Sequence, residues 1–264
     1  MPGLAPAPDD DHRLARDLAT KAGELLLQLR AQAGDSAYER WTLRDEGDLG
    51  SHHFLVDALH DARPGDRVLS EEGAEDLRRL GAHRVWIVDP LDGTREFGEP
   101  GRSDWAVHVA LVIDDQLAVG AVALPAMGVT YATGDPPRPV HLPDADSQPR
   151  FVISRSRPHP ATLVAAEALG ARLIPMGSAG AKAMAVVRGE AEVYAHAGGQ
   201  YEWDSAAPAA VAIAAGLHVS GVDGSALQWN KPDPWQPHLL ICRPALAEPV
   251  ASVVRAAVAA SEGT

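Results

Sequence analysis

VWIVDPLDGTREF, residues 85–97, begins as a compact apolar run and ends in a polar turn. The β-prone residues 85–88 predict a buried strand. The strand should stop at Asp89-Pro90, because proline lacks a backbone donor, and Asp92-Gly93 suits a turn. Asp89 and Asp92 can then face one point. Together with a turn carbonyl they suit a hard cation such as Mg²⁺, although DPLDG alone would be read as two common turn dipeptides.

Upstream and downstream segments place this turn in a layered half of the chain. Apolar residues at steps of three or four predict helices over 14–29 and 49–62. Val68-Leu69 reads as a short strand that ends in the acidic pair Glu71-Glu72. After the turn, further strands are expected, with the first two forming a buried hairpin: 105–113, 117–124 and 129–133.

The second half alternates between strand and helix patterns, which indicates α/β layering. Strands are expected at 151–154, 172–175 and 191–195, and helices at 160–169, 178–187 and 205–215. We therefore predict an α/β protein built as a five-layer α-β-α-β-α sandwich. Residues 1–9 should be a flexible tail, and residues 10–264 a single unit in two halves, 10–133 and 150–264, joined by the loop 134–149, which is rich in Pro and Asp.

Composition excludes several classes of protein. With 46% hydrophobic residues and a formal net charge of -13, the chain can bury a core but would repel nucleic acid polymers. Cys242 is the only cysteine, so an intramolecular disulfide and a cysteine-based zinc site are both excluded. The first residues lack signal-peptide features, and no apolar run approaches the roughly 20 residues of a membrane span. We expect no membrane association and a cytoplasmic location.

Two further acidic positions accompany the turn. Glu71 follows a predicted strand, and Asp204, within YEWDS (residues 201–205), precedes an alanine-rich helix, where it would ordinarily be read as an N-cap. An acidic pair, then DPLDGT, then WDSAAP resembles the motif set of the inositol monophosphatase superfamily, whose fold is this layered sugar phosphatase sandwich. The resemblance covers nearly the whole chain.

The resemblance implies a set of metal ligands and catalytic groups. Glu71, Asp89, Asp92, Asp204 and the carbonyl of Leu91 would bind two or three Mg²⁺ ions, while Thr94 and a distant Asp orient the attacking water. Asp48 is the candidate for that Asp, with an N-cap of the helix over 49–62 as the rival interpretation. Backbone N–H groups at Gly93 and Thr94 can hold phosphate oxygens. No P-loop and no nucleophile elbow occurs in the sequence.

Three segments resemble the CysQ-type branch, the 3′(2′),5′-bisphosphate nucleotidases. They are DGTREF (residues 92–97), SRSR (residues 154–157), which contains Ser154 and Arg155, and the set Gly177-Ser178 with Lys182. Arg155 and Lys182 would neutralise a second phosphate and Ser178 would donate to one, although ordinary surface roles are the alternatives for both cations. His196 stands where the branch commonly has an Arg, and a neutral imidazole cannot grip phosphate as a guanidinium does.

The resemblance implies hydrolysis of 3′-phosphoadenosine 5′-phosphate, and of its sulfated analogue, in support of sulfate assimilation. It also implies inhibition by Li⁺ and a homodimer. Inositol-1-phosphatase or fructose-1,6-bisphosphatase activity at the same site stays open. A catalytically silent nucleotide- or metal-binding regulator is the alternative of another class, disfavoured because every expected ligand is present.

Overall fold

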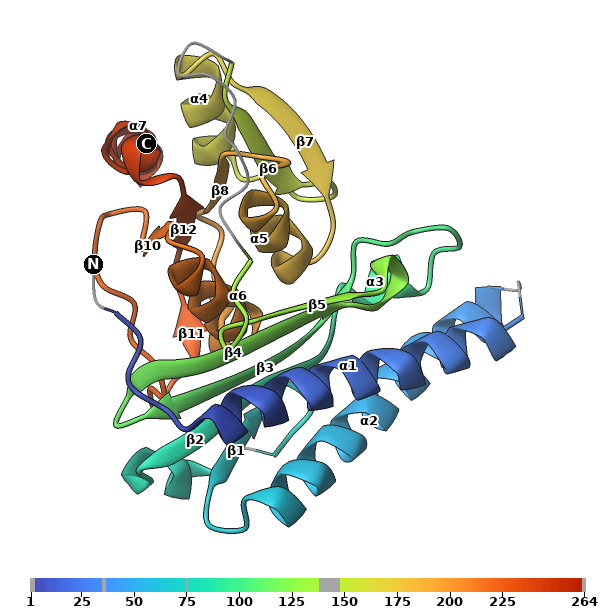
Figure 1. Ribbon diagram of the computed structural model, residues 1–264. Coiled ribbons are helices and arrows are strands. Elements are labelled where there is room, and N and C mark those ends of the chain that lie inside the picture. Colours follow the sequence, from blue (N-terminus) through green and yellow to red (C-terminus); the bar gives the residue numbers. More distant parts are fainter. Residues whose placement is uncertain (1–2, 35–36, 75, 138–147, 263–264) are drawn as a thin grey trace.

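The computed structural model describes residues 3–34, 37–74, 76–137 and 148–262. In Figure 1 the chain forms five layers, with two helices at the bottom, a sheet above them, two helices in the middle, a second sheet and two outer helices. The predicted α-β-α-β-α sandwich is confirmed. Each sheet comes from one half of the sequence, because the first contains β1–β5 and the second β6–β8, β10 and β12.

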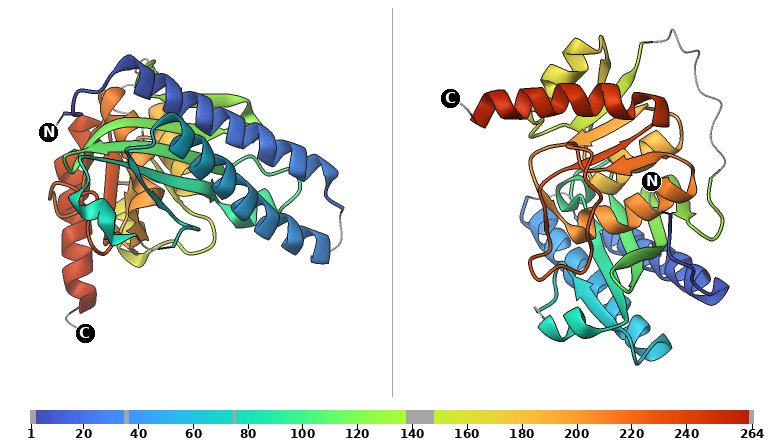
Figure 2. Two further views of the ribbon diagram at one scale, coloured as in Figure 1. Left: turned by 90° about the horizontal axis from the view of Figure 1, so that it is seen from below. Right: turned by 90° about the vertical axis from the view of Figure 1, so that its left-hand side faces the viewer.

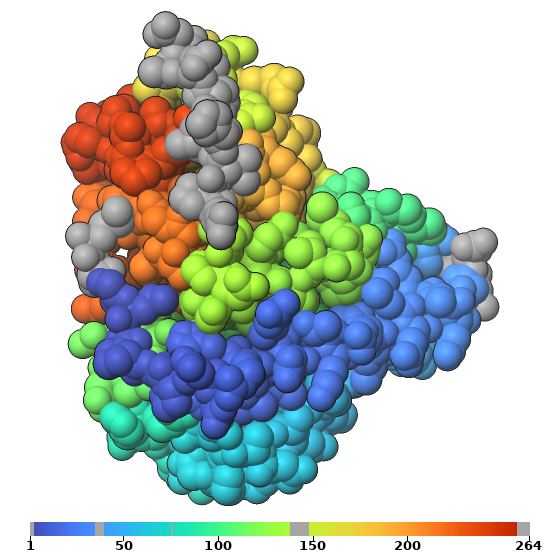
Figure 3. Space-filling model, viewed as in Figure 1, coloured from blue at the N-terminus to red at the C-terminus, as the bar shows by residue number. Residues whose placement is uncertain are grey.

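The first sheet has the order β1-β2-β3-β4-β5, with β1 parallel to β2 and the other pairs antiparallel. Its strands are β1 (Arg67–Ser70), β2 (Arg84–Asp92), β3 (Ala106–Ile113), β4 (Gln116–Leu124) and β5 (Val129–Ala132). Helices α1 (Asp9–Gln32) and α2 (Ala37–Ala62) cover its outer face. In the space-filling view, α1 forms a continuous band against the region of β5 (Figure 3).

The second sheet has the order β10-β12-β8-β6-β7, with β8, β6 and β7 parallel and the pairs on the other side antiparallel. Its strands are β6 (Arg150–Ser154), β7 (Arg172–Met176), β8 (Val193–His196), β10 (His218–Ser220) and β12 (Leu239–Cys242). Helices α4 (Pro160–Ala168) and α7 (Ala247–Glu262) pack together on its outer face, which the right-hand view of Figure 2 shows.

The middle layer contains α5 (Ala179–Val187) and α6 (Glu202–Ala214), whose small apolar side chains allow both sheets to approach them closely. Gly120 of β4 shows this contact, since an added Cβ would lie 2.6 Å from the Cβ of Ala210. The remaining elements are short: α3 (Thr94–Phe97), β9 (Gln200–Tyr201), β11 (Trp235–Gln236), η1 (Leu77–Gly81), η2 (Pro125–Met127) and η3 (Pro244–Leu246).

Two expected boundaries were wrong. Helix α2 begins at Ala37 rather than near 49, so Asp48 lies inside a helix and the N-cap interpretation of that residue fails. Residues 3–8 are not a loose tail, because the backbone N–H of Ala5 donates to the carbonyl of Leu117 at 2.7 Å and Leu4 packs on the core. Most of the predicted connecting loop, residues 138–147, lies outside the described residues.

No helix in the described parts of the chain is both long enough and apolar enough to cross a membrane.

Candidate active site

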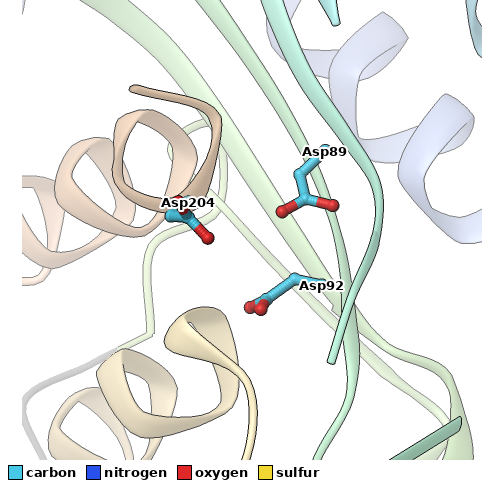
Figure 4. Close-up of side chains that lie close together, drawn as sticks. All are labelled: Asp89, Asp92 and Asp204. Carbon is cyan, nitrogen blue, oxygen red and sulfur yellow. The ribbon is translucent and has the colours of Figure 1, made fainter. Parts of the chain in front are cut away.

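Three carboxylates converge where β2 meets the N-terminus of α6 (Figure 4). Asp89, Asp92 and Asp204 each have a ligand oxygen within 4.8 Å of the others. In a regular strand, residues three apart point to opposite faces. Between Asp89 and Asp92 the pairing of β2 with β3 shifts by one residue, because Asp89 pairs with His108 and Asp92 with Ala106. This bulge turns both aspartates towards the middle layer.

The carboxylate of Asp92 occupies the N-terminus of α5. Its Oδ2 accepts hydrogen bonds from the hydroxyl of Ser178 (2.5 Å) and the N–H of Gly180 (2.6 Å), and its Oδ1 accepts one from Ala179 (3.1 Å). Burial alone would raise the pKa of Asp92, but hydrogen bonds and charges from His108, Lys182 and these donors lower it to about 2. A side chain of the first half therefore caps a helix of the second.

Ser178 was predicted to donate to a phosphate at this helix start, but its hydroxyl is committed to Asp92. The residue has a φ of 44°, a left-handed backbone conformation that is unfavourable for serine, and strain of this kind concentrates at functional sites. The same hydroxyl accepts the N–H of Ala181 at 2.9 Å. These bonds to Asp92 and to the first turn of α5 hold Ser178 in place.

His108 supports the cluster from β3. Its Nδ1 lies 3.0 Å from the carbonyl of Trp203, so that nitrogen carries a proton, and its Nε2 lies 3.2 Å from Oδ2 of Asp92. Gly180 leaves room for the imidazole, since an added Cβ would lie 2.1 Å from Nε2. The ring thus bridges β2 and the first turn of α6, the two elements that carry the carboxylates.

The cluster suits a cation because several buried carboxylates lie close enough together for their negative charges to repel one another. Burial and the charges of Glu71, Asp92 and Asp204 raise the pKa of Asp89 well above its usual range. Burial, then Asp92, raises the pKa of Asp204 to about 6, and loss of surrounding water with the charges of Asp204 and Asp48 raises the pKa of Glu71 to about 8. Oxygen donors that repel one another in this way fit a divalent cation such as Mg²⁺.

Asp48 and Thr94 meet beside the cluster. The hydroxyl of Thr94 lies 3.3 Å from Oδ1 of Asp48 and 3.1 Å from the carbonyl of Leu91. Burial, followed by the charge of Glu72, raises the pKa of Asp48 to about 7. The structure thus brings together two residues 46 positions apart in the sequence that were predicted to act on the same water.

A cavity of about 770 Å³ opens from the carboxylates towards the second half of the chain. The predicted site residues in its lining are Glu71, Asp92, Gly93, Ser154, Ser178, Lys182, His196 and Asp204. Arg155 is not in the lining, because its guanidinium donates to Glu96 and Glu99, each at 2.6 Å. Lys182 is buried and its Nζ donates to the carbonyls of Gly177 and Ser178 at 3.2 and 2.6 Å.

Comparison with known proteins agrees with this geometry. Residues 9–259 match the inositol monophosphatase family.

The chain belongs to the inositol monophosphatase family.

Members of this family are metal-dependent phosphatases, and the cluster of three carboxylates is suited to hold a metal ion. The chain is 48% identical over 232 residues to the 3′-phosphoadenosine 5′-phosphate phosphatase of Mycobacterium tuberculosis, covering 86% of each protein. It is 32% identical to the 3′(2′),5′-bisphosphate nucleotidase CysQ of Escherichia coli K12, covering 69% of this chain and 78% of that one. The crystal structure of CysQ from Bacteroides thetaiotaomicron superposes with a TM-score of 0.75 at 29% identity, over 89% of this chain and 97% of the other.

Several residues that line the cavity were not predicted from the sequence to belong to the site. Arg95 and Arg157 line the cavity with exposed side chains, and neither forms an ion pair with any residue that the structure describes. Both lie within motifs already singled out, DGTREF and SRSR, two positions on from the Gly93 and Arg155 that were chosen. Tyr201, Trp203 and Trp235 add an aromatic wall. No sequence pattern could have identified Trp235 as a lining residue, because its two-residue strand is too short to produce an apolar periodicity.

Proposed function

We propose that the chain is a Mg²⁺-dependent phosphomonoesterase that removes the 3′-phosphate of 3′-phosphoadenosine 5′-phosphate, yielding AMP and inorganic phosphate. The observation that carries this proposal is the cluster of Asp89, Asp92 and Asp204 beside a cavity that also contains Arg95 and Arg157, neither of which forms an ion pair with a described residue. The names of the relatives at 48% and 32% identity support a bisphosphorylated nucleotide as the substrate. In a cytoplasmic setting, this activity would clear a by-product of sulfate assimilation.

The residues that would hold Mg²⁺ are Asp89, Asp92 and Asp204, with Glu71 and the carbonyl of Leu91 completing the oxygen donors. Their chemistry fits, because hard cations take carboxylate and carbonyl oxygens, and here three carboxylates each place an oxygen within 4.8 Å of the others. When bound, Mg²⁺ supplies positive charge that polarises the phosphoryl oxygens and makes a water molecule more acidic. Two or three ions are proposed, as the family resemblance implies.

Thr94 and Asp48 would hold and deprotonate the attacking water. The single proton of the Thr94 hydroxyl can be donated either to Asp48 or to the carbonyl of Leu91, so its oxygen lone pairs remain available to accept a hydrogen bond from water. With its pKa raised to about 7, Asp48 accepts a proton more readily than an ordinary aspartate does at neutral pH. Both side chains come from the first half, the half that supplies Asp89 and Asp92.

The second phosphate would meet cations that line the cavity. Lys182 has one ammonium N–H left after its two bonds to backbone carbonyls, and Arg95 and Arg157 add two guanidinium groups at the cavity. Arg155, which pairs with Glu96 and Glu99, would instead hold the loop after α3 in place. Its predicted role as a direct phosphate ligand stays a prediction.

Comparison of substrates tests the proposal. Phosphate release would be measured from 3′-phosphoadenosine 5′-phosphate, inositol 1-phosphate and fructose 1,6-bisphosphate, with and without Mg²⁺ and Li⁺. We expect the nucleotide to give the highest kcat/KM, with turnover that needs Mg²⁺ and is inhibited by Li⁺. A higher kcat/KM for either sugar phosphate would contradict the nucleotide assignment, and turnover of none would favour a binding protein.

A further inference from the structure

The cavity has an aromatic wall that the carboxylate chemistry leaves unexplained. Tyr201 and Trp203 stack nearly parallel, with ring centroids 4.6 Å apart and an interplanar angle of 13°. Trp235 meets Tyr201 edge-on, at 5.3 Å and 79°. All three rings line the cavity that contains Asp92 and Asp204. Aromatic faces with this geometry offer a flat apolar surface to a ligand.

Exposure argues against a purely structural role for this wall. Trp235 is 42% exposed and Tyr201 41% exposed, although both lie in a concave part of the surface. A large aromatic side chain contributes to the core by removing its area from water, and these two leave much of theirs in contact with solvent. Exposed apolar area of this kind is typical of a binding surface.

The wall is held rigidly. Trp235 and Tyr201 are cross-strand partners in the small sheet of β9 and β11. Gly199 has a φ of 75°, and a Cβ added there would lie 1.9 Å from the Trp235 ring, so the indole rests directly on the backbone of residue 199. The N–H of Trp235 also donates to Oδ1 of Asp233 at 3.0 Å.

Hydrogen bonds also fix the distance between the aromatic wall and the carboxylates. Glu202, fully buried in the first turn of α6, accepts hydrogen bonds from the N–H groups of Asn230 (2.6 Å) and Lys231 (3.0 Å). These bonds tie the loop that precedes Trp235 to the helix turn that carries Asp204. A molecule with its phosphate at Asp204 would therefore find the wall at a constant separation.

From this geometry we propose that Trp235 and Tyr201 form a stacking subsite for the planar base of the substrate. The ligand class is a purine nucleotide, and the subsite makes nucleotides better substrates than sugar phosphates. This inference rests on the proposed function, because it assigns the base end of the same cavity. His196, whose Nε2 lies 2.8 Å from the carbonyl of Gly199, lines the same cavity.

Kinetics of a Trp235→Ala variant would test the subsite against two substrates. Base–aromatic stacking lost on alanine substitution corresponds to roughly a tenfold to hundredfold loss of affinity. We expect the KM for 3′-phosphoadenosine 5′-phosphate to rise by that factor with little change in kcat. Hydrolysis of 2-glycerol phosphate, which has no base, should be unchanged. Trp235→Phe, which keeps a stacking face, should restore most of the affinity and guard against misfolding of the alanine variant.

Binding gives a second readout that does not depend on turnover. Titration of AMP in the presence of Mg²⁺ should quench tryptophan fluorescence in the wild type. The quench should be smaller in Trp235→Phe, which keeps only Trp203 in the wall, although AMP still binds by calorimetry. Trp41→Ala is the matched control, since Trp41 is 58% exposed on α2 and does not line the cavity. It should leave both the KM and the quench of the remaining tryptophans unchanged.

Each outcome decides the inference. Equal losses on both substrates would overturn it, because the wall would then only position Asp204. An unchanged KM for the nucleotide would overturn it too, while leaving the proposed function intact if the wild type still prefers that substrate. A wild type that neither hydrolyses the nucleotide nor shows an AMP-dependent quench would overturn both.

Discussion

Asp92 shows how one residue can serve both chemistry and architecture. Its carboxylate belongs to the metal-binding cluster and also accepts two N–H groups of the first turn of α5. Ser178, at a φ of 44°, and Gly180 each adapt the helix to that role. The side chain is therefore fixed before any cation binds, as preorganised catalytic groups generally are.

Gly180 gives a prediction at this site. Replacing it with Ala would place a Cβ 2.1 Å from Nε2 of His108, so either the imidazole or the helix must move away from Asp92. We expect a loss of stability of about 1–3 kcal/mol, the usual cost of overpacking, together with a fall in kcat. Urea unfolding and initial rates would measure the two effects.

Gly65→Ala is the matched control for that substitution, because an added Cβ at Gly65 meets nothing within 4 Å. If the Gly180 variant kept wild-type activity and stability, the close packing of His108 on α5 would be irrelevant to the site.

Asp48 gives a prediction about pH. A base acts in its deprotonated form, and its pKa is raised to about 7, so kcat/KM should rise with pH up to about that value and then level off. Asp48→Asn should lower kcat by roughly 10²–10⁴-fold, the range for loss of a general base, and abolish this dependence. Asp57→Asn on the same helix should behave as wild type. An unaltered pH profile in Asp48→Asn would rule out Asp48 as the base.

Among the elements, prediction from sequence succeeded where apolar runs are continuous. Residues 85–88 and the hairpin over 105–124 became β2, β3 and β4, because strands buried on both faces leave a strong apolar signal. The start of α2 was missed because its first turns are rich in charged residues and contain Gly47. That glycine is needed for packing, since a Cβ there would lie 2.8 Å from the ring of Phe97.

The site was predictable in its motifs but not in its contacts. Asp89, Asp92 and Asp204 lie close together, as expected. Asp89 and Asp92 point to the same side of the sheet because of a bulge, and that bulge depends on how β2 pairs with β3. Arg157 lines the cavity, whereas Arg155 forms ion pairs with Glu96 and Glu99. Sequence spacing does not specify which of the two arginines forms these pairs.

Strand β12 leads to a prediction about Cys242, because this strand lies inside the second sheet, between β10 and β8. Burial raises the pKa of this thiol to about 12, and the thiolate is the reactive form. The native protein should therefore resist a disulfide reagent such as 5,5′-dithiobis(2-nitrobenzoate). One equivalent should react after unfolding, since Cys242 is the only cysteine. Rapid native labelling would mean that β12 opens readily.

For the whole molecule, the two halves share one apolar cluster and one site. The largest apolar cluster joins side chains of β2–β4, α5, α6 and the second sheet, and Asp92 links the halves at the active site. Glu71, Asp89 and Asp204 repel one another, so the site opposes folding until a cation binds. Stability and function are therefore expected to trade against each other at this point.

Thermal unfolding tests that trade. Mg²⁺ should raise the Tm of the wild type, by the equivalent of about 2.7 kcal/mol at a hundredfold excess over its Kd, because only the folded chain assembles the site. Without Mg²⁺, Asp89→Asn should have a higher Tm than the wild type, since it removes one of the clustered charges, and it should respond weakly to the ion. A variant less stable than the wild type without Mg²⁺ would show that Asp89 mainly supports the fold.

The most direct test of the central claim is hydrolysis of 3′-phosphoadenosine 5′-phosphate followed by ³¹P NMR, in wild type and in Asp89→Asn with Mg²⁺ present. The assignment predicts that the wild type releases the 3′-phosphate and leaves AMP, while the variant is nearly inactive. Release of the 5′-phosphate, or wild-type rates in Asp89→Asn, would contradict a phosphatase centred on Asp89, Asp92 and Asp204.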